Sequence, residues 1–419
     1  MSKKTLLTIV IALLGVSLIG TSIILLTNKP AKEEQGGSEE EKPKPINNPS
    51  GNFNVDVIKE MSIEENFLIS PYSIEIALNM LKEGAKGNTY DEIQKVVGSR
   101  DIKDISSEDN ISVANVVFIK NNYKDIIEDS FTKKLKTKYR SEVLYDDFNT
   151  PEVINNWVKE HTKGMIDKIL DSINKDFVLG IANAVAIDVT WETEFECDHT
   201  RSAEFSKYDG TKMNVEMMHN TYGGEVYKYF ETDSAKGVIL PYKKVGKEQL
   251  EFIGILPNKD VKSYISSLTN KELETIDKNA KSASSNTKID LSLPRFKYLY
   301  DAKTFMKNLE NLGIKDAFSS SEANFRNIIT EKNMSDNLYV STAIHKAYID
   351  LNEKGTKAAA VTYFGLEKNA VAERTNYFTV NFNKPFMYLI RDKETKDIIF
   401  AGTVYTPNVW NGSTCSESD

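Results

Sequence analysis

Cysteine and histidine are scarce in this chain: its 419 residues include two cysteines and four histidines. Cys197 and Cys415 lie far apart and form neither a metal motif nor a disulfide framework, which leaves a free thiol or a single bridge as alternatives. The histidines are scattered, and no His-Glu-x-x-His or Gly-x-Ser-x-Gly motif accompanies them. The sequence therefore predicts no metal site, no cofactor and no enzyme active site.

An excess of basic residues is also missing. Lys and Arg number 53 against 61 Asp and Glu, so the net charge is -8 and a general nucleic-acid-binding protein is not expected. Hydrophobic residues make up 40% of the chain, enough to bury the core of one large domain or two ordinary ones. No internal repeat is evident, and the patterns along the chain predict mixed α and β structure.

The N-terminal segment predicts export from the cytoplasm. After Lys3 and Lys4, residues 5–27 carry no charge, and as a helix they would cross a hydrocarbon layer of about 30 Å. The run exceeds the usual length of a signal-peptide apolar region, and no small-x-small cleavage site follows. We expect residues 1–28 to be a membrane anchor, with a cleaved signal peptide as the alternative. Residues 29–51 are rich in Lys, Glu, Pro and Gly and are predicted to be a disordered charged linker, which places the rest of the chain outside the cell, either anchored or secreted.

A buried helix is predicted to begin after Ser70, which suits the N-cap and precedes Pro71 at the first helical position. Its apolar face consists of Ile74, Ala77, Leu78 and Leu81. Residues 177–191 are predicted to form a buried strand that is interrupted by Asn183. A buried asparagine needs hydrogen-bond partners, so Asn183 is a candidate for a specific role.

A long segment near the C-terminus lies between the strand-like runs 338–351 and 377–390. Long ordered loops usually carry function. If residues 356–368 became a strand, Thr356, Ala358, Ala360, Thr362 and Phe364 would share one face, and four of these five are small. A flexible hinge or a short helix is the alternative, because alanine favours helices.

The sequence NEKGTKAAA at residues 352–360 resembles the proximal hinge of an inhibitory serpin, and FNKPF at residues 382–386 resembles the strand after the reactive loop. Further matches extend from about residue 58 to 407, and the chain resembles a prokaryote-like member of this family. The resemblance implies an α+β fold with three mostly antiparallel sheets, about nine helices and an exposed reactive loop. The domain is expected over residues 52–410, with a tail at 411–419.

The resemblance also implies functional positions. Ser70, Ser73, Asn183 and His345 would form a cluster that closes the central sheet. Trp191, Arg295 and Glu353 would lie at the top of the sheet, where Glu353 pairs with Arg295. The hinge would comprise Glu353, Gly355, Thr356, Ala358, Ala359, Ala360 and Thr362. Counting forward from the hinge puts the scissile bond at Lys368, Asn369 or Ala370, whereas counting backward from Phe382 puts it at Arg374 and Thr375. We favour the forward count, since the inserting arm must match the length of the sheet.

The function implied is suicide inhibition of a serine endopeptidase, or a cysteine endopeptidase, by a monomer that forms a covalent complex with its target. The cut reactive loop would enter the central sheet as a new strand. A non-inhibitory binding or structural protein of the same fold is the alternative. Catalysis by a serine and His345 is not expected, because such a pair also needs an orienting acid and an oxyanion hole.

Overall fold

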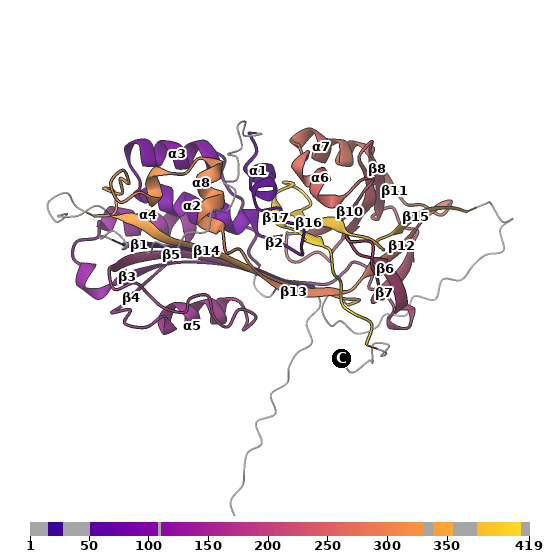
Figure 1. Ribbon diagram of the computed structural model, residues 1–419, viewed down its shortest axis with the longest axis horizontal. Helices are drawn as coiled ribbons and strands as arrows, with labels where there is room; N and C mark the ends of the chain where they lie inside the picture. The colour runs from indigo at the N-terminus through magenta and orange to yellow at the C-terminus, as the bar shows by residue number, and fades with distance from the viewer. Residues whose placement is uncertain (1–15, 28–50, 108–109, 330–337, 355–374, 412–419) are drawn as a thin grey trace, which may run out of the picture.

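The computed structural model describes residues 16–27, 51–107, 110–329, 338–354 and 375–411. These residues contain eight α-helices: α1 (Phe53–Glu60), α2 (Pro71–Gly84), α3 (Gly87–Val97), α4 (Asp129–Tyr139), α5 (Glu152–His161), α6 (Val261–Ser266), α7 (Asn270–Asn279) and α8 (Phe305–Leu312). The body is elongated, with most helices at one end and the two other sheets at the opposite end (Figure 1).

Three β-sheets organise the chain. The central sheet has the strand order β13 (Phe296–Asp301), β14 (Tyr339–Leu351), β1 (Val16–Thr27), β5 (Phe177–Val189), β3 (Ile111–Lys120) and β4 (Glu142–Asp146). The seven-stranded sheet has the order β11 (Lys281–Ser282), β8 (Lys228–Glu231), β9 (Ala235–Pro241), β10 (Leu250–Pro257), β16 (Phe386–Asp392), β17 (Ile398–Val404) and β2 (Leu68–Ile69). The four-stranded sheet has the order β15 (Asn376–Asn381), β12 (Thr287–Pro294), β7 (Lys212–Tyr222) and β6 (Arg201–Ser206).

Only the pairs β3–β4 and β12–β15 are parallel among the strands of the described residues. All other paired strands in this part of the chain are antiparallel, for example β1 with both of its neighbours. The predicted α+β fold with three mostly antiparallel sheets is therefore confirmed, with eight helices in the described part of the chain where about nine are expected overall.

Helices cover both faces of the central sheet. In Figure 1, α2, α3, α4 and α8 lie over one face and α5 lies over the other. Every residue of β5 is buried as a result. A strand that is covered on both faces has no solvent side, so its sequence is a continuous apolar run rather than an alternating one.

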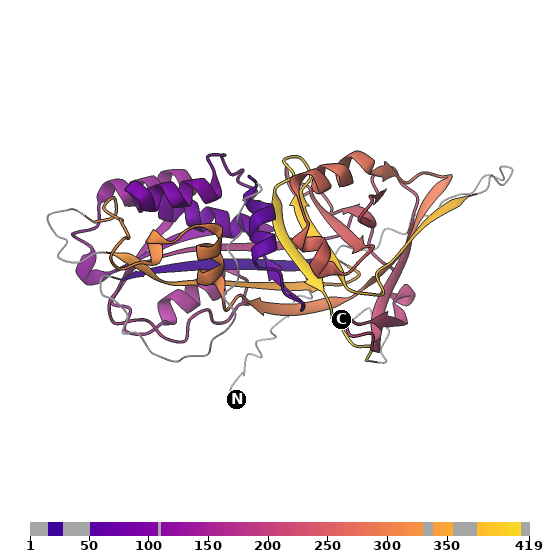
Figure 2. The ribbon, with the colours of Figure 1, turned by 45° about the horizontal axis from the view of Figure 1, so that its top comes forward.

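The middle of the central sheet is formed by the N-terminal segment. β1 lies between β14 and β5, as the indigo strand that runs along the centre of Figure 2 shows. For residues 16–27, the described part of the run 5–27, the structure thus has a strand where a membrane-spanning helix is predicted. The physical reason is that an uncharged apolar run satisfies a doubly covered strand as well as a lipid-facing helix, and this run is rich in β-branched residues. Across the described parts of the chain, no helix has the length and apolar character needed to cross a bilayer.

The start of α2 agrees with the prediction from sequence. Ser70 is the N-cap, its side chain accepts a hydrogen bond from the Ser73 amide, and Pro71 is the first helical residue. The predicted apolar face is buried. This helix therefore has a defined starting point directly against the central sheet, which positions the side chains described below.

Candidate functional site

A cluster of serines lies where the start of α2 meets the middle of the central sheet. Ser70 Oγ donates to the carbonyl of Ile399 at 2.8 Å and accepts from the amide of Ser73 at 3.1 Å. Ser73 Oγ lies 3.2 Å from Ser22 Oγ of β1. The three serine side chains are fully buried. A hydroxyl supplied by β1 therefore joins the predicted serines beneath the sheet.

His345 of β14 completes this closing cluster of Ser22, Ser70, Ser73 and His345. Its Nε2 accepts from the amide of Ser70 at 3.1 Å, so Nδ1 carries the proton and donates to Ser22 Oγ at 3.0 Å. Burial lowers the pKa of His345 to about 3, so the ring is neutral at physiological pH. Both His345 and Ser22 are 0% exposed, and no substrate can reach them. The cluster links α2, β1 and β14 and has no means of attacking a substrate.

Asn183 of β5 does not join the closing cluster. It pairs with Ser22 along the β1–β5 ladder, whereas His345 lies on the β14 side of β1. Asn183 Nδ2 donates to Asn115 Oδ1 at 2.8 Å. Its Oδ1 is buried and has no hydrogen-bond partner among the described residues. The expected bonds from Asn183 to the serines and to His345 are not formed, because β1 separates β5 from β14.

The top of the central sheet is closed by Trp191, which follows β5. Its Nε1–H donates to the carbonyl of Asn352, just after β14, at 2.9 Å. The indole stacks on Tyr242 with ring centroids 4.5 Å apart. Because Val16 pairs with Val189 near the end of β5, this bond joins the two strands that flank β1 at the end where β1 begins.

Glu353 is held in place by partners from other elements. Its carboxylate accepts from Arg295 Nε at 2.6 Å and from the hydroxyl of Thr200. Its carbonyl accepts from the amide of Phe195 at 3.0 Å, and Glu353 is only 2% exposed. Arg295 also lies 3.7 Å from Glu216. The predicted pair of Glu353 with Arg295 is thus present, and it fixes the chain at the point where the reactive loop is predicted to start.

Most of the predicted reactive loop lies outside the described residues. This applies to Gly355, Thr356, Ala358, Ala359, Ala360 and Thr362 of the hinge and to the scissile-bond candidates Lys368, Asn369, Ala370 and Arg374. Thr375 is described and is half-buried just before β15 of the four-stranded sheet. Cys415 also lies outside the described residues, whereas Cys197 takes part in a disulfide.

The contributions of Ser22, Asn115 and Thr200 were missed by reasoning from the sequence. A signal for Ser22 is present in hindsight. Gly20 and Ser22 are two small residues at alternate positions of an apolar run, a spacing that puts both on one face of a strand. For Asn115 and Thr200 the sequence holds no comparable signal, because their partners come from distant segments.

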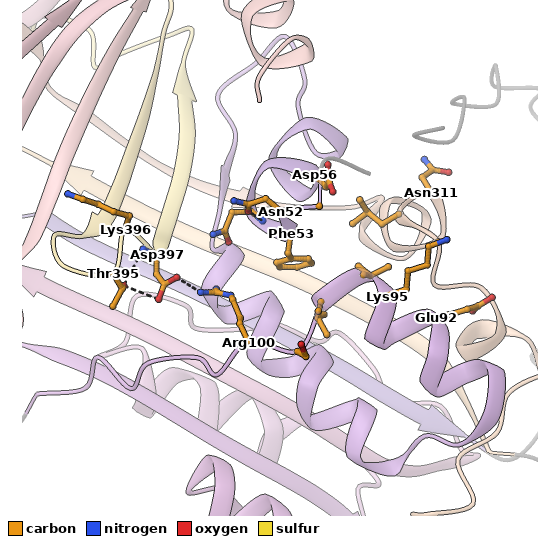
Figure 3. A pocket seen from close by; sticks show the side chains of 18 of the residues that line it. Asn52, Phe53, Asp56, Glu92, Lys95, Arg100, Asn311, Thr395, Lys396 and Asp397 are labelled. Atoms are coloured by element: carbon orange, nitrogen blue, oxygen red, sulfur yellow. Dashed lines mark hydrogen bonds and ion pairs between the residues drawn. The ribbon is translucent and has the colours of Figure 1, made fainter. Parts of the chain in front are cut away.

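A pocket of about 850 Å³ lies apart from these groups, between the start of α1 and the end of α3 (Figure 3). Arg100 projects from its wall and forms ion pairs with the buried Glu75 and with Asp397. Burial raises the pKa of Glu75, which the neighbouring guanidinium partly offsets. Arg100 is thus neutralised by two carboxylates, and we assign no ligand to the pocket.

Comparison with known proteins identifies the family and the fold. The chain matches the family model described as serpin (serine protease inhibitor) over residues 48–407. An uncharacterised serpin-like protein of Thermococcus kodakarensis is 30% identical over 87% of this chain and 86% of its own length. Intracellular coagulation inhibitor 2 of Tachypleus tridentatus is 31% identical over 81% of this chain and 85% of its own. The solved native state of the thermophilic serpin tengpin matches with a TM-score of 0.72 and 34% identity, covering 85% of this chain and 93% of that chain. The chain belongs to the serpin family.

Proposed function

We propose that this chain inhibits a serine endopeptidase, or a cysteine endopeptidase, by suicide trapping. Serpins are protease inhibitors rather than enzymes, and inhibitors are among the relatives of this chain. The nucleophile of the protease attacks a carbonyl of the reactive loop and gives up its proton, the C–N bond breaks, and the leaving amine takes up that proton. The acyl group stays bound to the protease. The cut loop then enters the central sheet and carries the protease with it.

The proposal rests on one observation: the central sheet accepts a strand between β5 and β14. β1 fills this position with 12 residues and is antiparallel to both neighbours. Ser17 lies opposite Asp350, so β1 begins at the end of the sheet where β14 ends. A reactive loop that leaves β14 and turns back would therefore take this position in the same direction. We call it the acceptor position.

The predicted arm, residues 356–368, suits the acceptor position in length and in side-chain size. At about 3.3 Å per residue the arm would span roughly 43 Å, enough to carry a protease from one end of the sheet toward the other. Close to α2 the position takes only small side chains, since a Cβ at Gly20 would lie 2.6 Å from Ser70 Cβ. The arm has small residues at four of the five alternate positions of this face, and Phe364 near its end is the one large side chain there.

Insertion is expected to be effectively irreversible. Each ladder hydrogen bond that the arm gains contributes about 1 kcal/mol net, and roughly a dozen would form. Reversal would have to break these bonds together, so the rate at which the arm leaves the sheet would be very slow.

The test is a single substitution in the arm, made in the chain that begins at residue 29. Thr356→Arg puts a charge on the face that becomes dry on insertion, at a cost of several kcal/mol. We expect the chain from residue 29 with no substitution to form an SDS-stable complex with its target protease. The same chain with Thr356→Arg should be cut without forming one. Lys357→Arg is the matched control. It also introduces an arginine, but at a position that points to the other face and already carries a positive charge. Cleavage of the wild type without any complex, for every protease tried, would contradict the proposal.

The scissile bond is proposed at Lys368, Asn369 or Ala370, as the length of the acceptor position favours. A trypsin-like protease would cut after Lys368, and an asparagine-specific one after Asn369. Mass spectrometry of the C-terminal fragment released from the complex identifies the bond. A cut only between Arg374 and Thr375 would show that the forward count is wrong.

A non-inhibitory binding or structural role is the second candidate, because β1 already fills the acceptor position. A protein that never vacates this position could not insert its loop. Thermal denaturation separates the two functions: an inhibitor should melt at a higher temperature after its loop is cut, whereas a non-inhibitory protein should melt at the same temperature before and after.

The proposed location is extracellular, with a monomer either anchored at the cell surface or secreted. Lys3 and Lys4 before an uncharged run, followed by the charged linker of residues 29–51, support export. Fractionation of cells tests this location. Recovery of the protein in the cytosol alone would contradict it.

A further inference from the structure

β1 matches the acceptor position on the face toward α2. Gly20 lies against Ser70 and Phe400, where an added Cβ would approach to 2.6 Å and 3.2 Å respectively. Two residues on, Ser22 Oγ bonds both Ser73 and His345, at 3.2 Å and 3.0 Å. Gly20 thus has no room for a side chain, and the hydroxyl of Ser22 bonds two buried polar groups. This face of β1 is therefore specific, and not a generic apolar filling.

The opposite face of β1 is matched to α5 and β5. Ile23 and Leu25 are 0% and 4% exposed and belong to the core that includes Trp157 of α5. Leu25 lies opposite Gly180 of β5, where a Cβ would come within 3.0 Å of the leucine Cδ2. The absence of a side chain at Gly180 thus leaves the space that Leu25 fills.

The reactive loop and residues 16–27 require the same position. Both would run antiparallel to β14 and β5, starting where β14 ends, and one strand excludes the other. We infer that β1 is an autoinhibitory strand: while residues 16–27 stay in the central sheet the reactive loop cannot insert, and their withdrawal makes the inhibitor competent. This inference rests on the proposed function, because it assigns a regulator to the same acceptor position.

β1 should hold the acceptor position against the intact loop because it buries more apolar surface. Ile23, Ile24, Leu25 and Leu26 are each no more than 4% exposed. The alternate positions of the loop from Thr356 to Thr362 are alanine or threonine, which offer less apolar area to bury at a similar number of ladder bonds. Withdrawal of residues 16–27, by cleavage or into a membrane, removes this competitor.

Three substitutions in the full chain separate a specific strand from an incidental one. Gly20→Leu keeps the segment apolar but collides with Ser70, and Ser22→Arg puts a charge beside the buried His345. Both should release β1. Thr21→Val is the matched neighbour: Thr21 Oγ1 is buried with no hydrogen-bond partner among the described residues, so its replacement should keep β1 in place or hold it more firmly.

The first measurement is hydrogen–deuterium exchange of residues 16–27. In the wild type and Thr21→Val we expect protection of at least about 100-fold over an unstructured chain, and in Gly20→Leu and Ser22→Arg we expect its loss. Unchanged protection in β16 and β17 shows that each variant is folded. Exchange of residues 16–27 at the unstructured rate in the wild type would overturn the inference.

The second measurement uses a fluorescent synthetic peptide with the sequence of residues 356–368. It should bind Ser22→Arg and Gly20→Leu at least about tenfold more tightly than the wild type, with Thr21→Val like the wild type. Equal binding to all four proteins would overturn the inference. Since neither measurement uses a protease, a failure of the proposed inhibition is seen separately: peptide binding would follow this pattern while no variant formed a covalent complex.

A third measurement compares the rates of complex formation with a target protease. The full-length Ser22→Arg protein should form the complex at least about tenfold faster than the full-length wild type, because its acceptor position is free. Equal rates for the two proteins would show that β1 does not control insertion.

Discussion

Acidification should weaken the closing cluster, because His345 is buried in its neutral form. Burial lowers the pKa of His345 from the ordinary value of 6.5 to about 3 in the folded chain. Between these values the unfolded chain binds a proton that the folded chain does not, so stability is lost as the pH falls below about 6.5 and the loss is complete near pH 3. At pH 5.0 the loss from this residue is about 2 kcal/mol relative to pH 7.5.

The assay is urea denaturation at pH 7.5 and at pH 5.0 for the wild type and His345→Gln. Glutamine can accept from the Ser70 amide and donate to Ser22, but it does not titrate. We expect the pH-dependent loss to be about 2 kcal/mol smaller in His345→Gln than in the wild type. Phe305, whose ring centroid is 5.7 Å from that of His345, provides a control. Phe305→Leu should lower stability equally at both pH values, because it changes packing alone. An identical pH-dependent loss in the wild type and His345→Gln would refute the reasoning.

Two further predictions concern the top of the central sheet. Glu353→Gln removes the charge that Arg295 faces and should cost about 2 kcal/mol of stability in urea denaturation. Lys297→Gln, which breaks a partly exposed ion pair with Asp350 between β13 and β14, should cost less than about 1 kcal/mol in the same assay. Trp191→Phe loses the bond to the carbonyl of Asn352 and should cost about 1 kcal/mol, with faster amide exchange at the end of β14; unchanged exchange there would show that this bond does not close the sheet.

Much of the architecture could be predicted from local pattern and resemblance. Ser70 and Pro71 mark the start of α2 because an N-cap and a first helical proline depend on adjacent residues alone. The pair of Glu353 with Arg295 followed from a resemblance to the family, since the two residues are far apart in sequence. Such positions can be predicted because one short motif, or one pair within a known fold, specifies each of them.

Only the tertiary structure decided the state of residues 16–27. The sequence by itself determined that this segment avoids water, because it is uncharged and apolar. It did not determine what would cover the segment, since a helix in lipid and a strand covered on both faces need the same composition. The choice depends on elements from distant parts of the chain. β5 and β14 offer backbone groups that β1 pairs with, and Gly180 of β5 leaves space for Leu25. Ser73 of α2 and His345 of β14 offer buried groups that bond Ser22. The same reason explains why Asn183 bonds Asn115 and not the expected serines and His345: β1 lies between β5 and β14.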